Sequence, residues 1–149
     1  MIESNKRSGH STIIDEIAEQ LKGTIPSLII SSCGGGGLLC GIIEGMRRHE
    51  WTSVPILAME TKGADSLNAA VRAGSPIVPV TIPSITSVAK SLGALAICQQ
   101  LADDYNKGSP PIISHLVDDK DAVDACLRFA DKHRILVEPV SDLLCHRND

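Results

Sequence analysis

Apolar residues recur along the chain in two spacings, and stretches with the two spacings alternate. Apolar residues three or four apart predict helices, whereas short runs rich in Ile, Leu and Val predict buried strands. The predicted helices cover residues 12–22, 38–48, 66–73, 91–105 and 119–133. The predicted strands cover residues 27–32, 54–60, 111–116 and 135–138. This alternation predicts an α/β fold, with a mainly parallel sheet in a three-layer αβα arrangement.

Polar residues mark where several of these elements begin. Residues 1–10 are expected to form an irregular lead-in, after which Ser11 or Thr12 can cap the first helix. Asp118 and Asp119 can cap the last helix. That helix is expected to turn four residues inward, namely Val123, Cys126, Leu127 and Ala130.

Composition narrows the class of protein. The chain has 149 residues, a net charge of −4 and only 2% aromatic residues. The negative charge and the scarcity of aromatic rings argue against nucleic acid as a partner. No apolar stretch reaches the roughly 18 residues of a membrane span, and the first residues lack an apolar signal core, so the expected location is the cytoplasm. Five cysteines without a C-x-x-C pair are expected to be reduced and mostly buried.

Four consecutive glycines, Gly34–Gly37, lie between a predicted strand and a predicted helix. Glycine lets the backbone adopt positive φ and approach a ligand closely. The amide groups at the start of a helix then offer an anion site, and phosphate is its usual occupant. A tight turn without a ligand is the simpler alternative, although one or two glycines would suffice for it.

The residues after the glycines restrict the kind of phosphate ligand. A nucleoside-triphosphate loop requires Gly-Lys-Ser/Thr, and Leu38-Leu39-Cys40 stands there instead. A dinucleotide fold requires a third glycine, which is missing in both possible frames. Glu60 nevertheless ends the next strand, where a ribose-binding acid would lie, so a Rossmann-like phosphate- or nucleotide-binding module stays open as an alternative.

Four motifs in order resemble one enzyme family. The sequence is similar to the eukaryotic L-serine dehydratases/L-threonine deaminases, which belong to the tryptophan-synthase-β-like (fold type II) enzymes that use pyridoxal 5′-phosphate (PLP). The resemblance covers about residues 5–139. The motifs are Ser32-Cys33-Gly34-Gly35-Gly36-Gly37-Leu38-Leu39-Cys40-Gly41, Ala58-Met59-Glu60-Thr61-Lys62-Gly63-Ala64, Ile85-Thr86-Ser87-Val88-Ala89-Lys90-Ser91-Leu92-Gly93 and Ile135-Leu136-Val137-Glu138-Pro139.

The resemblance implies two sets of site residues. The cofactor phosphate is expected on the glycine backbone and the following leucine, which are Gly34, Gly35, Gly36, Gly37 and Leu38. A monovalent cation such as potassium is expected nearby, held by the Glu60 carboxylate and by main-chain oxygens. The complete set is Gly34, Glu60, Ala64, Leu92 and Ala94.

The resemblance also shows what these residues lack. The family's Schiff-base lysine lies in a Ser-x-Lys segment well before the glycines, and nothing here matches it; Lys90 belongs to another motif. Residues 1–139 therefore resemble part of the PLP-binding large domain, truncated at both ends, and residues 140–149 look like a divergent tail.

The implied reaction is that of an ammonia-lyase, which converts serine, and threonine in the same way, to an oxo acid and ammonia. The fragment itself is expected to contain no catalytic residue and to be inactive. Relatives are homodimers, so the resemblance implies one here too. Another enzyme of the same fold, such as threonine synthase or cysteine synthase, is the alternative within the family.

Overall fold

The computed structural model describes residues 3–138, in which helices alternate with parallel strands. The helices are α1 (Glu3–Gln20), α2 (Gly37–Arg48), α3 (Ser66–Ala73), α4 (Gln99–Lys107) and α5 (Asp119–His133). The strands are β1 (Ile29–Ser32), β2 (Ile56–Thr61) and β3 (Ile112–Val117). The predicted α/β class is confirmed.

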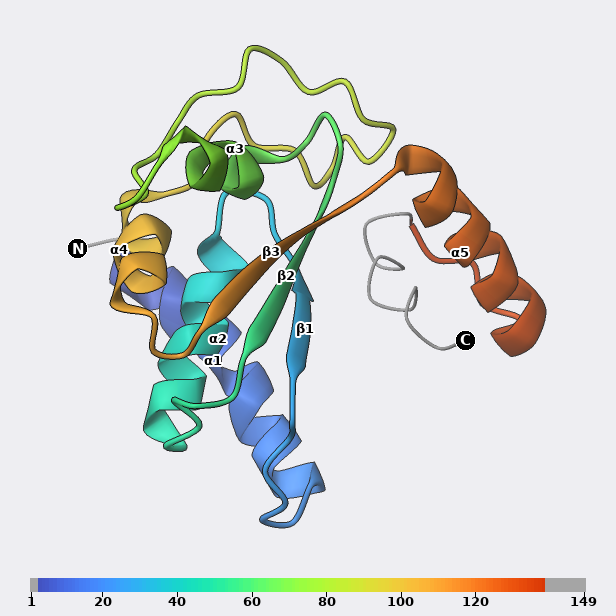
Figure 1. Cartoon of the computed structure of the whole chain (residues 1–149). Helices are drawn as coiled ribbons and strands as arrows, with labels where there is room; N and C mark the ends of the chain where they lie inside the picture. Colours follow the sequence, from blue (N-terminus) through green and yellow to red (C-terminus); the bar gives the residue numbers. More distant parts are fainter. Residues whose placement is uncertain (1–2, 139–149) are drawn as a thin grey trace.

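The three strands form one parallel sheet in the order β1-β2-β3 (Figure 1). The register aligns Ile30 with Leu57, and Leu57 with Ile113. Because the strands are parallel, their carboxyl ends lie at the same edge of the sheet. The glycine segment after β1 and the segment after β2 therefore start from neighbouring points, which is where α/β proteins commonly bind ligands.

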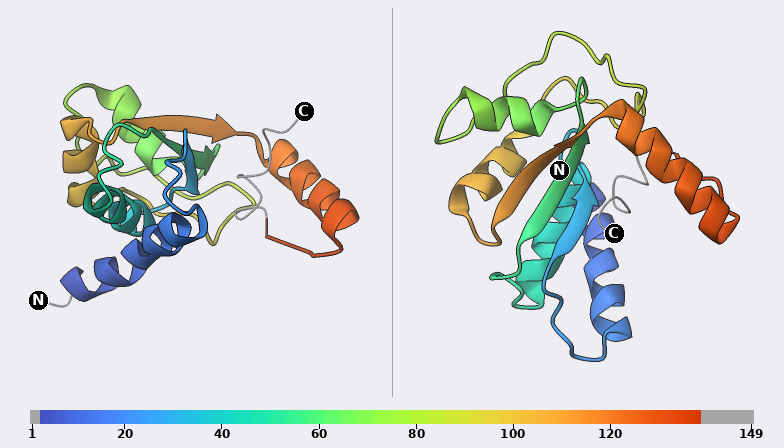
Figure 2. Two further views of the ribbon diagram at one scale, coloured as in Figure 1. Left: turned by 90° about the horizontal axis from the view of Figure 1, so that it is seen from below. Right: turned by 45° about the vertical axis from the view of Figure 1, so that its right-hand side comes forward.

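The main core lies on one face of this sheet, where α1 and α2 pack side by side (Figure 2). Gly45 of α2 permits this packing, because a Cβ there would be 2.7 Å from the Cβ of Ile14 in α1. Helices α3 and α4 close the same core. The large side chains without solvent exposure that form it are Ile14, Leu39, Ile43, Met46, Ile56, Leu67 and Leu101.

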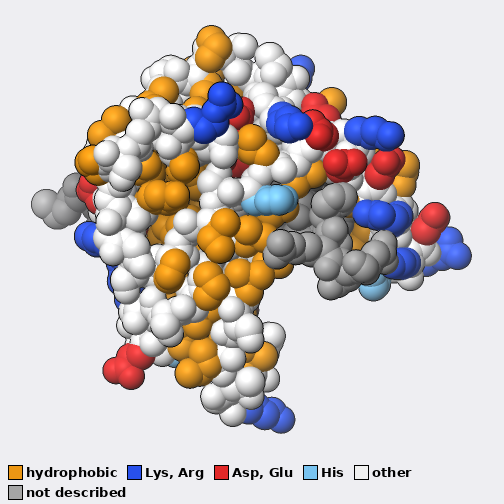
Figure 3. Space-filling model, in the orientation of Figure 1, with side chains coloured by type: hydrophobic (Ala, Val, Ile, Leu, Met, Phe, Trp, Pro, Cys, Tyr) orange, Lys and Arg blue, Asp and Glu red, His pale blue; other side chains and the backbone are white. Residues whose placement is uncertain are grey.

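The opposite face of the sheet carries a smaller apolar cluster. Leu57 and Met59 of β2 are its centre, Val117 extends it along β3, and Ala122 of α5 packs against it. Ile113 on β3 is half-exposed. Figure 3 shows hydrophobic side chains gathered over the strands on the side turned toward the viewer in Figure 1. Within residues 3–138 this third layer is therefore only partly built.

The predicted irregular lead-in is wrong, because α1 begins at Glu3 and passes through Gly9. Thr12 does not cap the helix: its hydroxyl donates to the Gly9 carbonyl at 2.9 Å, inside the helix. Packing of Ile14 on α2 outweighs the helix-breaking tendency of a single glycine, which costs only about 1 kcal/mol.

The predicted helix over residues 91–105 is wrong in its first half, because α4 begins only at Gln99. The earlier residues use their backbone groups for contacts with distant segments. The Leu95 carbonyl accepts from the Ile82 amide at 2.8 Å, and the Cys98 amide donates to the Gly35 carbonyl at 2.9 Å. These long-range bonds replace the local bonds of a helix.

Two predictions near the end of the chain are also wrong. Residues 135–138 form no strand, and Leu136 is 82% exposed. Helix α5 buries Ala122, Ala125 and Cys126, whereas Val123 and Leu127 face outward. Apart from the starts of α1 and α4 and the strand at 135–138, the bounds of the predicted elements agree with the structure within two residues. The proposed tail, 140–149, lies outside the described residues, as does Pro139 of the last motif.

None of the helices in the described residues is both long and apolar enough to cross a membrane.

Candidate phosphate site

The glycine segment connects β1 to α2 at the carboxyl edge of the sheet. Gly36 is the residue before the helix and has φ 92°, a left-handed conformation that side chains disfavour. The chain then turns directly into α2, whose first turn is closed by a 2.9 Å bond from the Cys40 amide to the Gly36 carbonyl. The helix therefore starts with its amide groups turned toward the end of β1.

Several of these amide groups have no acceptor. Among the described residues, no hydrogen bond is made by the N–H groups of Gly35, Gly36, Gly37 or Leu38. The helix dipole adds partial positive charge at the same point. Four free donors beside a helix start are suited to an anion with several oxygens, such as a phosphate ester.

Packing explains part of the glycine run without a ligand. A Cβ on Gly34 would collide with the Leu92 carbonyl, and a Cβ on Gly36 would lie 2.6 Å from Leu101 Cδ2. Gly37 differs, because a Cβ there would meet no atom within 4 Å. The close packing of neighbouring residues therefore requires glycine at positions 34 and 36, whereas Gly37 borders open space.

That space is a hollow of about 240 Å³. Its lining consists of Ser32, Cys33, Gly34, Gly35, Gly36, Gly37, Leu38, Leu39, Ser91 and Leu92. All five residues predicted to hold the phosphate are in this set. Ser91 was not singled out from the sequence, although it lies in the third motif; its hydroxyl donates to the Glu138 carboxylate at 3.1 Å.

Two of the residues predicted to hold a cation, Gly34 and Leu92, lie in contact and line the hollow. The Gly34 carbonyl accepts a 3.2 Å bond from the Ser66 hydroxyl, and Gly34 also contacts Leu92. Ala94 lies 3.4 Å from the position of a Cβ on Gly35, and Ala64 is fully buried at the turn after β2. Ser66 is another neighbour of this group that sequence reasoning missed. The described residues contain no cluster of three or more His, Cys, Asp or Glu side chains suited to a metal ion.

Glu60 is completely buried at the end of β2. Its two carboxylate oxygens accept 2.8 Å bonds from the amides of Leu67 and Asn68, at the start of α3. Burial nevertheless raises its pKa to about 7, and the charge of Asp65 adds to the rise. A side chain so enclosed is poorly placed to meet a ribose, which disfavours the dinucleotide alternative.

The neighbouring Cys33 is a packed thiol. It is 1% exposed, and burial, with the nearby Glu60 charge, raises its pKa well above the usual range. A protonated, enclosed thiol is a poor nucleophile. Within the described residues, no lysine lines the hollow: Lys90 lies outside its lining, and Lys62 pairs with Asp118 at 2.7 Å.

A hydroxyl network holds the segment that supplies Leu92. Ser87 donates to the Asp119 carboxylate at 2.6 Å and lies 2.8 Å from the Thr61 hydroxyl. The Val88 amide donates to the same carboxylate. Asp119, expected only to help cap a helix, thus ties the third motif to α5 and β2.

Comparison with known proteins identifies the family. The family described as pyridoxal-phosphate dependent enzyme matches residues 3–144. The chain belongs to this family. The match extends beyond the described residues and into the segment that was expected to be divergent, so the boundary at residue 139 stays a prediction.

Individual relatives are serine dehydratases. The chain is 45% identical over 131 residues to a serine dehydratase-like protein of Mus musculus. It is 44% identical over 131 residues to the L-serine dehydratase/L-threonine deaminase of the same organism. Each match covers 88% of this chain and 38% of the relative. The crystal structure of a fungal L-serine ammonia-lyase from Rhizomucor miehei superposes with a TM-score of 0.86 at 34% identity, over 94% of this chain and 43% of that one. The chain therefore spans well under half the length of the relatives it matches.

Proposed function

We propose that these residues form the phosphate-binding part of a PLP-dependent L-serine ammonia-lyase that also acts on L-threonine. The observation that carries the proposal is the set of four unbonded amides, Gly35 to Leu38, which face a hollow at the start of α2. The names of the relatives supply the substrate class. The family supplies the cofactor.

The chain's own contribution is to hold and orient a phosphate ester. Each amide of the glycine loop can donate one charge-assisted hydrogen bond, and the helix dipole favours the same negative charge. The rigid packing of Gly34 and Gly36 fixes these donors before a ligand arrives. When bound, the cofactor supplies an electron-withdrawing ring that acidifies the α-carbon of the amino acid. The lining of the hollow contains no lysine among the described residues, and the proposal assigns the proton transfer to the lysine that the family resemblance implies.

We further propose that a monovalent cation, potassium in the first instance, binds behind the loop. The Glu60 carboxylate and the carbonyl oxygens of Gly34, Ala64, Leu92 and Ala94 are the proposed ligands. A hard cation prefers such oxygen ligands. The buried Glu60 charge, whose pKa is raised to about 7, would gain a compensating positive charge.

Calorimetry can test the phosphate site on the 149-residue chain. Pyridoxal 5′-phosphate should bind, inorganic phosphate should compete with it, and pyridoxal, which lacks the phosphate, should bind at least about tenfold more weakly. Equal binding of pyridoxal and its phosphate would show that the glycine loop does not hold the ligand. Binding of NADH in preference to pyridoxal 5′-phosphate would favour the nucleotide-binding alternative.

Activity requires two assays. The 149 residues alone should form no pyruvate from L-serine above a blank that contains cofactor only. A chimera in which residues 3–138 replace the matched segment of the Rhizomucor miehei enzyme should form pyruvate. A folded chimera that binds the cofactor but leaves L-serine unchanged would contradict the proposed substrate class, and turnover of O-phosphohomoserine or O-acetylserine instead would point to threonine synthase or cysteine synthase.

A cytoplasmic location and a homodimer complete the proposal. The first is the expectation from the sequence and the second comes from the family resemblance. Fractionation of cells and the mass of the assembled protein in solution test them separately.

A further inference from the structure

Two cysteine thiols lie against each other next to the glycine loop. The Sγ atoms of Cys40 and Cys98 are 3.8 Å apart, although 58 positions separate the residues along the chain. Both are attached to the loop through their backbones, since the Cys40 amide donates to the Gly36 carbonyl and the Cys98 amide to the Gly35 carbonyl, each at 2.9 Å. Neither thiol is in a disulfide in this structure.

We propose that Cys40 and Cys98 form a reversible intrachain disulfide when the protein meets a peroxide. A disulfide requires a separation of about 2.05 Å, so the sulfurs must approach by roughly 1.8 Å. Cys98 stands just before α4 with an extended backbone (φ −73°, ψ 153°), so its side chain is not confined by a preceding helical turn. Rotation about its Cα–Cβ bond is the movement that the proposal requires.

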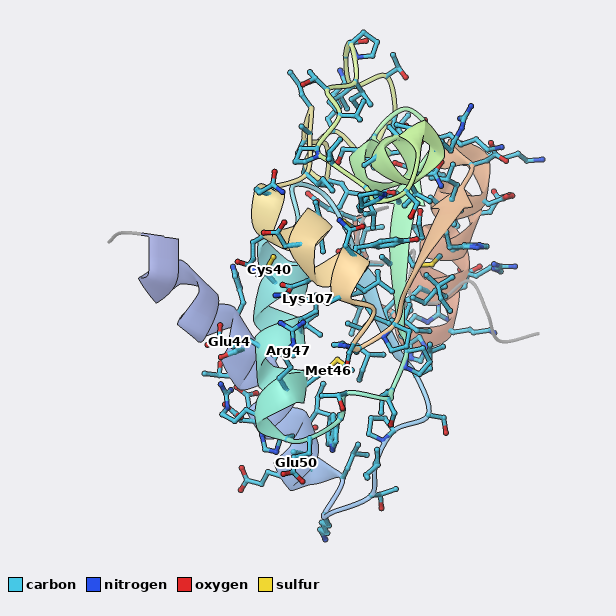
Figure 4. The ribbon with its side chains drawn as sticks, turned by 60° about the vertical axis from the view of Figure 1, so that its left-hand side comes forward. Cys40, Glu44, Met46, Arg47, Glu50 and Lys107 are labelled. Carbon is cyan, nitrogen blue, oxygen red and sulfur yellow. The ribbon has the colours of Figure 1, made fainter. Side chains whose placement is uncertain are left out.

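Both cysteines lie close to space that a small oxidant can enter. Cys40 borders a second hollow of about 240 Å³ between α2 and α4, whose other lining residues are Glu44, Arg47, Gln100 and Asp104. Figure 4 shows Cys40 and Arg47 along α2 where α4 passes it. Cys98 is itself half-buried. Hydrogen peroxide is small and uncharged, so the acidic side chains at this hollow do not repel it.

The chemistry balances without another reactant. One thiol loses its proton, and the thiolate attacks a peroxide oxygen. The O–O bond breaks and the sulfur becomes a sulfenic acid. The hydroxide that leaves takes up the proton of the thiol and becomes water. The second thiol attacks this sulfur, the S–O bond breaks and a second water leaves. Two thiols and one hydrogen peroxide thus give one disulfide and two waters.

A third cysteine of this region, Cys33, lines the other hollow, and its thiol donates to the Gly34 carbonyl at 3.5 Å. Cys33 is protonated by its raised pKa and is 1% exposed. The Cys40–Cys98 bond would join α2 to the start of α4, and would restrict the segment that packs on Gly35 and Gly36. The proposal concerns this chain's own thiols and is independent of the proposed enzyme activity.

Peptide mapping of the reduced 149-residue chain tests the proposal without any cofactor. After mild hydrogen peroxide treatment, alkylation and digestion under non-reducing conditions, the Cys40–Cys98 peptide pair should be the main disulfide, at least about tenfold above any other pair. The same treatment in urea should spread the bonds over all five cysteines. Dithiothreitol should restore both thiols.

Matched variants make the result decisive. Cys40→Ala and Cys98→Ala should each abolish the main disulfide, whereas Cys126→Ala should retain it, with circular dichroism used to confirm that each variant is folded. The oxidised wild-type chain should unfold at a higher urea concentration than the reduced one, because the bond closes a long loop. The proposal is overturned if Cys40–Cys98 is no more abundant in the native chain than in urea, or if Cys126→Ala removes the bond as completely as Cys98→Ala.

Discussion

Replacing Gly36 by alanine separates the packing requirement of the glycine loop from its role with a ligand. The backbone of Gly36 has φ 92°, which costs an L-residue about 1–2 kcal/mol. The new Cβ would lie 2.6 Å from Leu101 Cδ2 and 3.0 Å from Leu101 Cβ, and Leu101 is fully buried. Overpacking of this kind costs about 1–3 kcal/mol. After subtraction of about 0.5–1 kcal/mol for the stiffer unfolded chain, Gly36→Ala should lower the free energy of unfolding by about 1–4.5 kcal/mol.

Gly37→Ala is the matched control one residue later. No atom lies within 4 Å of the new Cβ, and alanine is a better helix former than glycine, so stability should stay equal or rise by up to about 1 kcal/mol. The added methyl group borders the hollow, so binding of pyridoxal 5′-phosphate should weaken even though the fold is intact. Urea unfolding followed by circular dichroism measures the stabilities, and calorimetry measures the binding. Equal stability of the two variants would refute the packing argument, and unchanged binding by Gly37→Ala would refute the placement of the phosphate.

Three further predictions concern charge and ligand. The pKa of Glu60 is raised from 4.5 to about 7, so between these pH values the folded chain holds a proton that the unfolded chain has released. The free energy of unfolding should therefore fall by about 3 kcal/mol between pH 4.5 and 7. Glu60→Gln should remove this dependence in urea titrations at several pH values. If the cation site is as proposed, potassium should stabilise the wild-type chain more at pH 8 than at pH 5, and a pH-independent effect would contradict it. Arg47→Ala breaks a 2.8 Å ion pair with Asp104, whose side chain is 3% exposed, and should lower the free energy of unfolding by about 1–3 kcal/mol. Arg48→Ala breaks an exposed ion pair and should lower it by less than about 1 kcal/mol. Equal losses of the two variants in urea unfolding would contradict the role of burial.

The sequence was most informative where local pattern and long-range packing agree. The run Gly34–Gly37 predicted a strand, a sharp turn and a helix start with available amides, and the structure has all three. The helix at 66–73 was also predicted to the residue, because its apolar spacing matches the side it buries. In these places, the local preference and the tertiary contacts favour the same conformation.

The errors come from bonds to distant residues. Nothing in the pattern of residues 91–98 shows that the Cys98 amide bonds to Gly35, or that Leu95 bonds to Ile82. Residues 135–138 pair with no strand of the sheet, although β1 and β3 each keep an unpaired edge among the described residues, and the local pattern does not show this. The Asp119 contacts with Ser87 and Val88 were missed for the same reason, since 32 and 31 positions separate the partners.

The backbone amides of the glycine loop give the most direct test of the central claim. In nitrogen-15-labelled chain, addition of pyridoxal 5′-phosphate should shift the amide signals of Gly35, Gly36, Gly37 and Leu38, while pyridoxal without phosphate leaves them nearly unchanged. The Gly45 amide, which lies within α2, is the internal reference. Shifts concentrated elsewhere, or the same shifts with pyridoxal, would contradict the claim that this loop holds the phosphate.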